Sequence, residues 1–386
     1  MSEPVKKINP SPESYSPKNK PEILAVAENL TTLPESAKIA FAGSINQNGP
    51  AFGPHTLAFA SAATSLVVLM GAPHDTSVME AHNTTWRNDN NYYRNLMISG
   101  EGFQFWNDVW NYFTDELPPL SEDHYKGGSW EANYSGAKDA TPILDCFEIT
   151  GIKVDVYTNY PVKSIKGGWS NPQALVNLTL CNLADGFPVL LLSGEPGDHI
   201  VLATGYENNG ETLLAWTFTA GDRLKTNIKF SPAKYKRLKD WTKGVLAAVL
   251  IKSPHMPPND TKPLLCKALS RGAELLRADT NPDRFRETFC GKGRPHVYPE
   301  IWDLAERRCY LGDALERAAS EFETDKLKPA IDASRQIHDE LWKVHAIWKE
   351  KKTKAAKWQI ADILSECRQL DFTIADTIAA FLAEDE

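Results

Sequence analysis

Two adjacent residues near the middle of the chain, Asp198 and His199, carry side chains suited to acid–base chemistry. They directly precede an apolar run from Ile200 to Thr204. An imidazole exchanges a proton readily near neutral pH, so His199 is a candidate general base. A histidine beside a turn also serves as an ordinary hydrogen-bonded residue, so chemistry at this position requires a nucleophile or a ligand nearby.

Hydroxyl groups that could serve as the nucleophile lie in segment 55–73, HTLAFASAATSLVVLMGAP, whose apolar run predicts a helix. Ser61 and Thr56 are the hydroxyl candidates, and His55 is a further polar residue at the start of the segment. A serine attacks a carbonyl group only when a base removes its proton. The hypothesis of a serine nucleophile therefore requires His199 to approach Ser61.

A second group of candidates would bind a ligand rather than react with it. Glu101 is flanked by two glycines, which allow a backbone to approach a ligand closely, although a turn explains them equally well. Phe103 belongs to the aromatic-rich segment from Trp86 to Trp130. Such density is typical of core packing, and the alternative is an aromatic pocket for an apolar or ring-bearing ligand.

The elements around His199 are predicted by three short apolar runs separated by turns. Asn208, Asn209 and Gly210 tolerate the positive φ angles of a tight hairpin, and Glu195–Gly197 form the other turn. These features predict a β-meander with His199 at the start of its central strand. The three predicted strands are Val189–Leu192, Ile200–Thr204 and Thr212–Phe218.

This order of motifs resembles the second half of papain-like proteins, in the group around the C39-type peptidases and the butirosin-biosynthesis H acyltransferase. The shared features are Gly186-Phe187-Pro188-Val189-Leu190, the histidine followed by aliphatic residues and Gly205-Tyr206, and a strand with Trp216. The resemblance covers roughly residues 38 to 252. It implies an α+β fold in which a helix packs on an antiparallel sheet.

The resemblance also assigns roles to individual positions. His199 would be the general base, and Trp216 would lie where the family has the residue that orients the imidazole. Gln47 would correspond to the glutamine that stabilises an oxyanion. The nucleophilic cysteine of the family would fall near Ala58, and no cysteine precedes Cys146 in this chain.

Two functions follow from that missing thiol. The preferred hypothesis is a degenerate cysteine-peptidase-like protein that binds a small molecule, a peptide or a carrier-linked acyl intermediate. Its cleft would be lined by Asp198, His199, Trp216 and residues 47–61. The alternative is an active acyl-transfer enzyme, an amidase, peptidase or acyltransferase, with a nucleophile on residues 55–65 or with Cys146 or Cys181. A substitution of alanine for the cysteine would also explain the sequence.

Composition excludes several other classes of protein. The net charge is −8 and the isoelectric point is near 5.7, which argues against nucleic acid or an anionic membrane as a partner. The N-terminus lacks the apolar region of a signal peptide, and six cysteines without paired spacing suit a reducing compartment, so a cytoplasmic location is expected. We find no HExxH or zinc spacing and predict no metal or cofactor.

Changes in composition and residue spacing along the chain predict four parts. Residues 1–21 are a proline-containing disordered leader, 22–252 the papain-like domain, 253–263 a proline-rich linker and 264–386 a helical domain. Within the last part, apolar residues at helical spacing predict three long helices, over 304–322, 327–348 and 360–381. These helices would pack on the first domain or form a homodimer.

Overall fold

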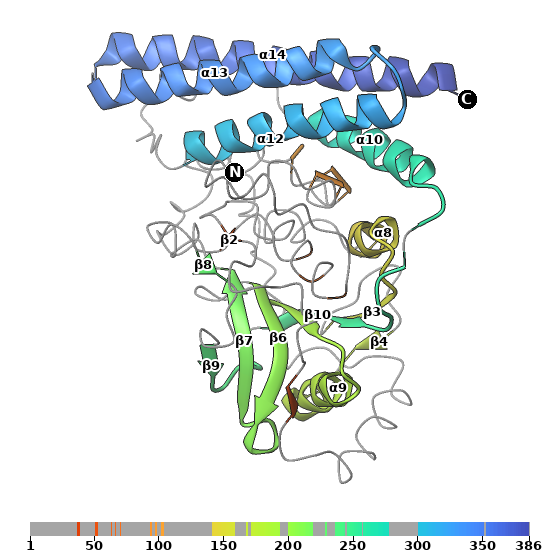
Figure 1. The fold of residues 1–386 in the computed structure, drawn as a ribbon. Coiled ribbons are helices and arrows are strands. Elements are labelled where there is room, and N and C mark those ends of the chain that lie inside the picture. Colours follow the sequence, from red (N-terminus) through yellow and green to blue (C-terminus); the bar gives the residue numbers. More distant parts are fainter. Residues whose placement is uncertain are drawn as a thin grey trace, which may run out of the picture. The chain divides into compact units, whose positions relative to one another are not determined.

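The computed structural model describes the chain in two compact units, each with its own core (Figure 1). We call them the sheet unit, which includes residues 141–259, and the helical unit, which includes residues 93–103 and 260–385. The described residues are 37–38, 51–52, 63, 66, 70, 93–94, 97–98, 102–103, 141–158, 167–168, 171–193, 200–218, 228–229, 236–243, 245–256, 258–277, 300–350 and 353–385.

The sheet unit is built on a mainly antiparallel sheet with the strand order β4-β3-β10-β5-β6-β7-β9, and β1 pairs with β6. A separate pair, β2 and β8, forms a second small sheet. The predicted meander is confirmed, because β5, β6 and β7 are consecutive antiparallel neighbours. The strands are β1 Ala37–Lys38, β2 Ala51–Phe52, β3 Val154–Thr158, β4 Gly167–Gly168, β5 Val189–Ser193, β6 Ile200–Glu207, β7 Thr212–Phe218, β8 Ile228–Lys229, β9 Lys236–Leu238 and β10 Val245–Ile251.

The turn between β6 and β7 forms for the reason that the sequence indicates. Asn208 and Asn209 both have φ of 54°, and Gly210 has φ of 91°. Asparagine and glycine are the residues that adopt this left-handed region at low cost. The indole Nε1 of Trp241 donates a hydrogen bond to the Gly210 carbonyl at 3.0 Å and so fixes the turn from outside.

Helix α9, Pro172–Ala184, covers one face of the sheet and has a defined cap at each end. The Asn171 side chain accepts a hydrogen bond from the Ala174 amide at 2.9 Å, as an N-cap residue does. At the other end Gly186 has φ of +88°, and the amides of Gly186 and Phe187 bond back to the carbonyls of Leu183 and Asn182. This is the Schellman arrangement, which ends the helix and turns the chain into β5.

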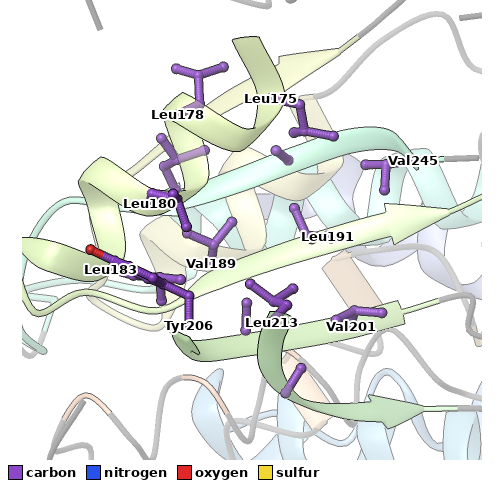
Figure 2. Packing of buried hydrophobic residues seen from close by; sticks show 14 of the residues in the cluster. Leu175, Leu178, Leu180, Leu183, Val189, Leu191, Val201, Tyr206, Leu213 and Val245 are labelled. Carbon is purple, nitrogen blue, oxygen red and sulfur yellow. The ribbon is translucent and has the colours of Figure 1, made fainter. Parts of the chain in front are cut away.

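The core between α9 and the sheet consists mainly of apolar side chains (Figure 2). Leucines on one side of α9 meet alternate residues of the neighbouring strands. Burial of these side chains is the main stabilising contribution in the sheet unit. The cluster contains Tyr157, Ala174, Leu175, Leu178, Leu180, Leu183, Val189, Leu191, Val201, Ala203, Tyr206, Leu213, Ala215, Val245, Ala248 and Leu250.

The helical unit consists of long helices whose buried residues recur at three- and four-residue spacing. Figure 1 shows α13 and α14 running side by side. The three predicted helices are present, and a fourth, α10, was not predicted. The helices are α10 Lys262–Arg277, α12 Glu300–Glu321, α13 Lys328–Glu350 and α14 Lys354–Asp385, while α8, Thr141–Ile149, belongs to the sheet unit. Among the described residues, each helix is too short or too polar to cross a membrane.

Candidate functional site

The described end of strand β6 lies next to the predicted base in the sequence. Ile200, the residue after His199, is the first residue of β6 and pairs with Leu192 of β5 and Phe218 of β7. Ladders on both sides therefore hold the strand at Ile200, the residue that follows His199 in the sequence. Most of the predicted site residues lie outside the described residues, namely Gln47, His55, Ala58, Ser61, Glu101, Asp198 and His199.

The backbone of Trp216 lies in β7, where it pairs with Leu202 of β6. A β-bulge interrupts this same pair of strands. Ala203 pairs with Ala215 and Gly205 pairs with Leu214, so Thr204 is an extra residue in β6. The Thr204 hydroxyl is fully buried and donates to the Leu214 carbonyl at 3.4 Å.

The bulge changes which side chains face α9. Before it, Val201 and Ala203 belong to the core under the helix, whereas after it Tyr206 does. Side chains alternate along a regular strand, so if Thr204 took a regular paired place in β6, Tyr206 would face the opposite side of the sheet. Bulges are frequent beside functional sites because they redirect side chains in this way. The sequence alone gave no sign of this bulge.

Two residues of the predicted helix 55–73 are described as helical, Ala63 and Leu66, and both are completely buried. The Met70 amide donates to the Leu66 carbonyl at 3.0 Å, which continues the helical spacing. The Met70 carbonyl in turn accepts a hydrogen bond from the His255 amide at 3.1 Å. Ala63 and Leu66 therefore belong to the core.

Phe103 lies in the helical unit and not in the sheet unit that contains Trp216. Its side chain is 1% exposed. The ring packs against Gly272 of α10 so closely that a Cβ atom on that glycine would lie 2.5 Å from ring carbons. Phe103 thus contributes to the core of the helical unit, and its role in binding a ligand stays a prediction.

Two of the candidate nucleophiles are described, Cys146 and Cys181. Cys146 is completely buried in α8. Cys181 is half-buried in α9, and burial raises the pKa of its thiol, with a further contribution from the Asp185 carboxylate. Lys252 opposes this effect only in part. Nucleophilic cysteines have a lowered pKa because the thiolate is the reactive form.

The Lys252 ammonium group has a structural partner near Cys181. Its Nζ donates to Oδ1 of Asn182 at 2.9 Å. The amide nitrogen of the same Asn182 side chain donates to the carbonyls of Phe187 and Pro188, both at 3.1 Å. This buried asparagine therefore links the end of α9, the start of β5 and the residue after β10. The Lys252 side chain thus joins the residue after β10 to α9.

The environment of Cys181 makes a prediction about its reactivity. Iodoacetamide at pH 7.5 should modify Cys181 more slowly than it modifies an unstructured cysteine peptide, because less of the thiol is ionised. The rate should rise with pH and reach half its limit at a higher pH than the peptide does. Peptide mass mapping at a series of pH values measures this site separately from the other cysteines. Faster modification of Cys181 than of the peptide at pH 7.5 would contradict a raised pKa of the Cys181 thiol.

In the part of the chain that the structure describes, no group of three or more histidine, cysteine, aspartate or glutamate side chains could hold a metal ion.

The described residues define an α+β protein with an antiparallel sheet unit and a helical unit. A comparison of the chain with models of known protein families finds no match. No curated protein matches the chain either.

Proposed function

We propose that the sheet unit is a degenerate papain-like domain that binds a small molecule, a peptide or a carrier-linked acyl group in a cleft around His199. The observation that carries this proposal is the state of the candidate thiols. Cys146 is fully buried, burial raises the pKa of Cys181, and no cysteine precedes them in the chain. A papain-like site without an activated thiol keeps its capacity to bind an acyl group but lacks its usual nucleophile.

The arrangement of the meander supports a binding site at this end of the sheet. Ile200 is held on both sides by β5 and β7, and the Thr204 bulge follows four residues later. A site on such a ladder has a rigid support, which lowers the entropy cost of binding. His199 would supply a polar group that orients the ligand among apolar neighbours.

The test uses two probes, an S-acetyl-pantetheine thioester and an N-acetyl dipeptide amide. Isothermal titration calorimetry measures binding, and release of free thiol or amine measures turnover. We expect saturable binding of at least one probe without turnover. His199→Ala should weaken binding about twofold to tenfold, the effect of one lost neutral hydrogen bond. His255→Ala, a change at a half-buried histidine beyond β10, is the matched control and should leave binding unchanged.

The outcomes separate the two functions. Turnover that His199→Ala abolishes and His255→Ala preserves would replace the binding proposal with the acyl-transfer alternative, and Ser61→Ala and Thr56→Ala would then identify the nucleophile. Equal binding by the wild type and His199→Ala would remove His199 from the site. If neither the thioester nor the dipeptide amide binds, the proposed ligand chemistry is overturned.

A further inference from the structure

A short segment that is distant in sequence from the C-terminal helices is buried among them. Tyr93, Met97, Ile98 and Phe103 are each at most 2% exposed and belong to the helical unit. Tyr93, Arg94, Met97 and Ile98 are helical, and Gly102 and Phe103 form a turn. The spacing of Tyr93 and Met97 is that of one helical face. The segment Tyr93–Phe103 therefore has an apolar side that the helical unit covers.

Arg308 of α12 holds the end of this segment through its backbone. The Arg308 side chain has no exposed surface, and its Nη1 donates to the Gly102 carbonyl at 2.6 Å. Its other donors make a two-point contact with Asp371 of α14, from Nε at 2.8 Å and from Nη2 at 3.0 Å. The planar guanidinium group is the side chain that can bond a carboxylate on one edge and a carbonyl on another.

Other contacts attach the segment to the helical unit along its length. Arg271 of α10 donates to the Ile98 carbonyl. Arg94 donates to both carboxylate oxygens of Glu321 at 3.2 Å. The Tyr93 hydroxyl donates to Asp313 at 3.3 Å, and the Arg317 guanidinium carbon lies 4.4 Å from the centre of the Tyr93 ring. With Phe103 against Gly272, the segment contacts both α10 and α12.

We infer that the segment Tyr93–Phe103 and the C-terminal helices form one cooperative unit, in which the buried Arg308–Asp371 pair acts as a latch on the segment. Opening the segment would remove the Gly102 carbonyl from a buried guanidinium group and expose four buried apolar side chains. An arginine that loses a partner inside a protein keeps the full cost of its desolvation. The segment should therefore open only when the helices open. The inference requires no ligand and is independent of the proposed function.

Native-state hydrogen exchange of the full-length protein at low denaturant concentrations tests this inference. Exchange of the Met97, Ile98 and Phe103 amides should be slowed by the same factor as exchange of the Ile337 and Leu341 amides in α13. The opening free energies of both groups should fall with denaturant concentration at the same slope. The amides of Leu190 and Leu202 report on the sheet unit. Exchange at the segment that is independent of α13, or that follows the sheet unit, would overturn the inference.

A conservative variant tests the latch itself. Arg308→Lys keeps the positive charge beside Asp371 but cannot reproduce the forked contact with the Gly102 carbonyl. We expect about tenfold faster exchange at both the segment and α13, with no change at Leu190 and Leu202. Arg277→Lys, at an exposed ion pair of α10 with Asp376, is the control and should change neither. If Arg308→Lys does not fold, Ser334→Ala, which removes the 2.6 Å bond from its hydroxyl to the Arg308 backbone carbonyl, tests instead whether the segment and α13 exchange together.

Faster hydrogen exchange at the segment alone would show that the segment opens separately from the helices. Faster exchange in the sheet unit as well would show that the cooperative unit extends beyond the segment and the C-terminal helices. Unchanged exchange everywhere would show that Arg308 is not the latch. Each of these results contradicts the inference.

Discussion

Replacement of Asp371 with alanine is expected to lower the free energy of unfolding of the helical unit by about 3–5 kcal/mol, the usual cost of removing one partner from a buried ion pair. Asp371 has no exposed side-chain surface and accepts two hydrogen bonds from the equally buried Arg308. The Nη1 atom of Arg368, a residue of the same helix α14, lies 3.6 Å from Oδ2 of Asp371. The substitution leaves positive charge in the core that water cannot solvate.

The control is Asp376→Ala, which makes the same change on the same helix. Asp376 also pairs with an arginine, Arg277, but its side chain is 72% exposed. Pairs in solvent contribute little, so this variant should unfold close to the wild type. Urea unfolding followed by far-ultraviolet circular dichroism compares the two. Equal midpoints for Asp371→Ala and Asp376→Ala would contradict the energetic importance of the buried pair.

Replacement of Gly151 with alanine is expected to destabilise the sheet unit by about 3 kcal/mol or more, the sum of a backbone cost and a steric one. Gly151 has φ of +71°, where a side chain is disfavoured. A Cβ atom there would lie 1.9 Å from the Met256 carbonyl oxygen. That carbonyl belongs to the backbone of a residue whose own amide donates to the Gly151 carbonyl at 2.9 Å, so it cannot move aside easily.

Gly186→Ala separates the two contributions. Gly186 also has positive φ, +88°, but nothing lies within 4 Å of the Cβ position. This variant should show only the backbone cost of about 1–2 kcal/mol. Thermal unfolding of both variants and the wild type measures the difference. If Gly186→Ala is as unstable as Gly151→Ala, the contact with Met256 has no energetic weight.

The sheet unit was predictable from sequence where local chemistry decides the structure. Gly186 ends α9, and Asn208 to Gly210 supply the positive φ angles of the hairpin, so three strands could be placed without any knowledge of their partners. The position of β10 between β3 and β5 was not predictable in this way, because its pairing joins residues far apart in the chain. The Thr204 bulge also depends on a partner strand rather than on Thr204 itself.

The spacing of apolar residues predicted three of the long helices but did not predict which charged residues are buried. The apolar spacing over 360–381 predicts Leu370 on the buried side of the last helix, whereas the structure shows Leu370 as half-buried and its neighbour Asp371 as completely buried. Charged residues at core positions escape a search for apolar spacing, although the gap between Leu304 and Leu311 at Arg308 is a signal. Helix α10 was not predicted, although its buried residues recur at helical spacing, namely Leu265, Ala268, Leu269, Gly272, Ala273 and Leu276.

The predicted site depended more on resemblance than on local pattern. The structure describes the backbone of Trp216 and the side chain of Phe103 and places them in different units. Aromatic density near Phe103 indicated either a core or a pocket, and its burial against Gly272 fits the core. Which partner covers an aromatic side chain is a non-local property, so composition alone cannot decide it.

The placement of Tyr93–Phe103 with the C-terminal helices has a practical meaning for dividing the protein into fragments. A cut between Asn259 and Asp260 falls within the proline-rich linker, yet it leaves Tyr93, Met97, Ile98 and Phe103 on one piece and the helices that cover them on the other. The first piece would expose an apolar surface that favours aggregation, and the second would contain an arginine deprived of the Gly102 carbonyl. Loss of function after deletion of the C-terminal helices would therefore not show that those helices contact a ligand.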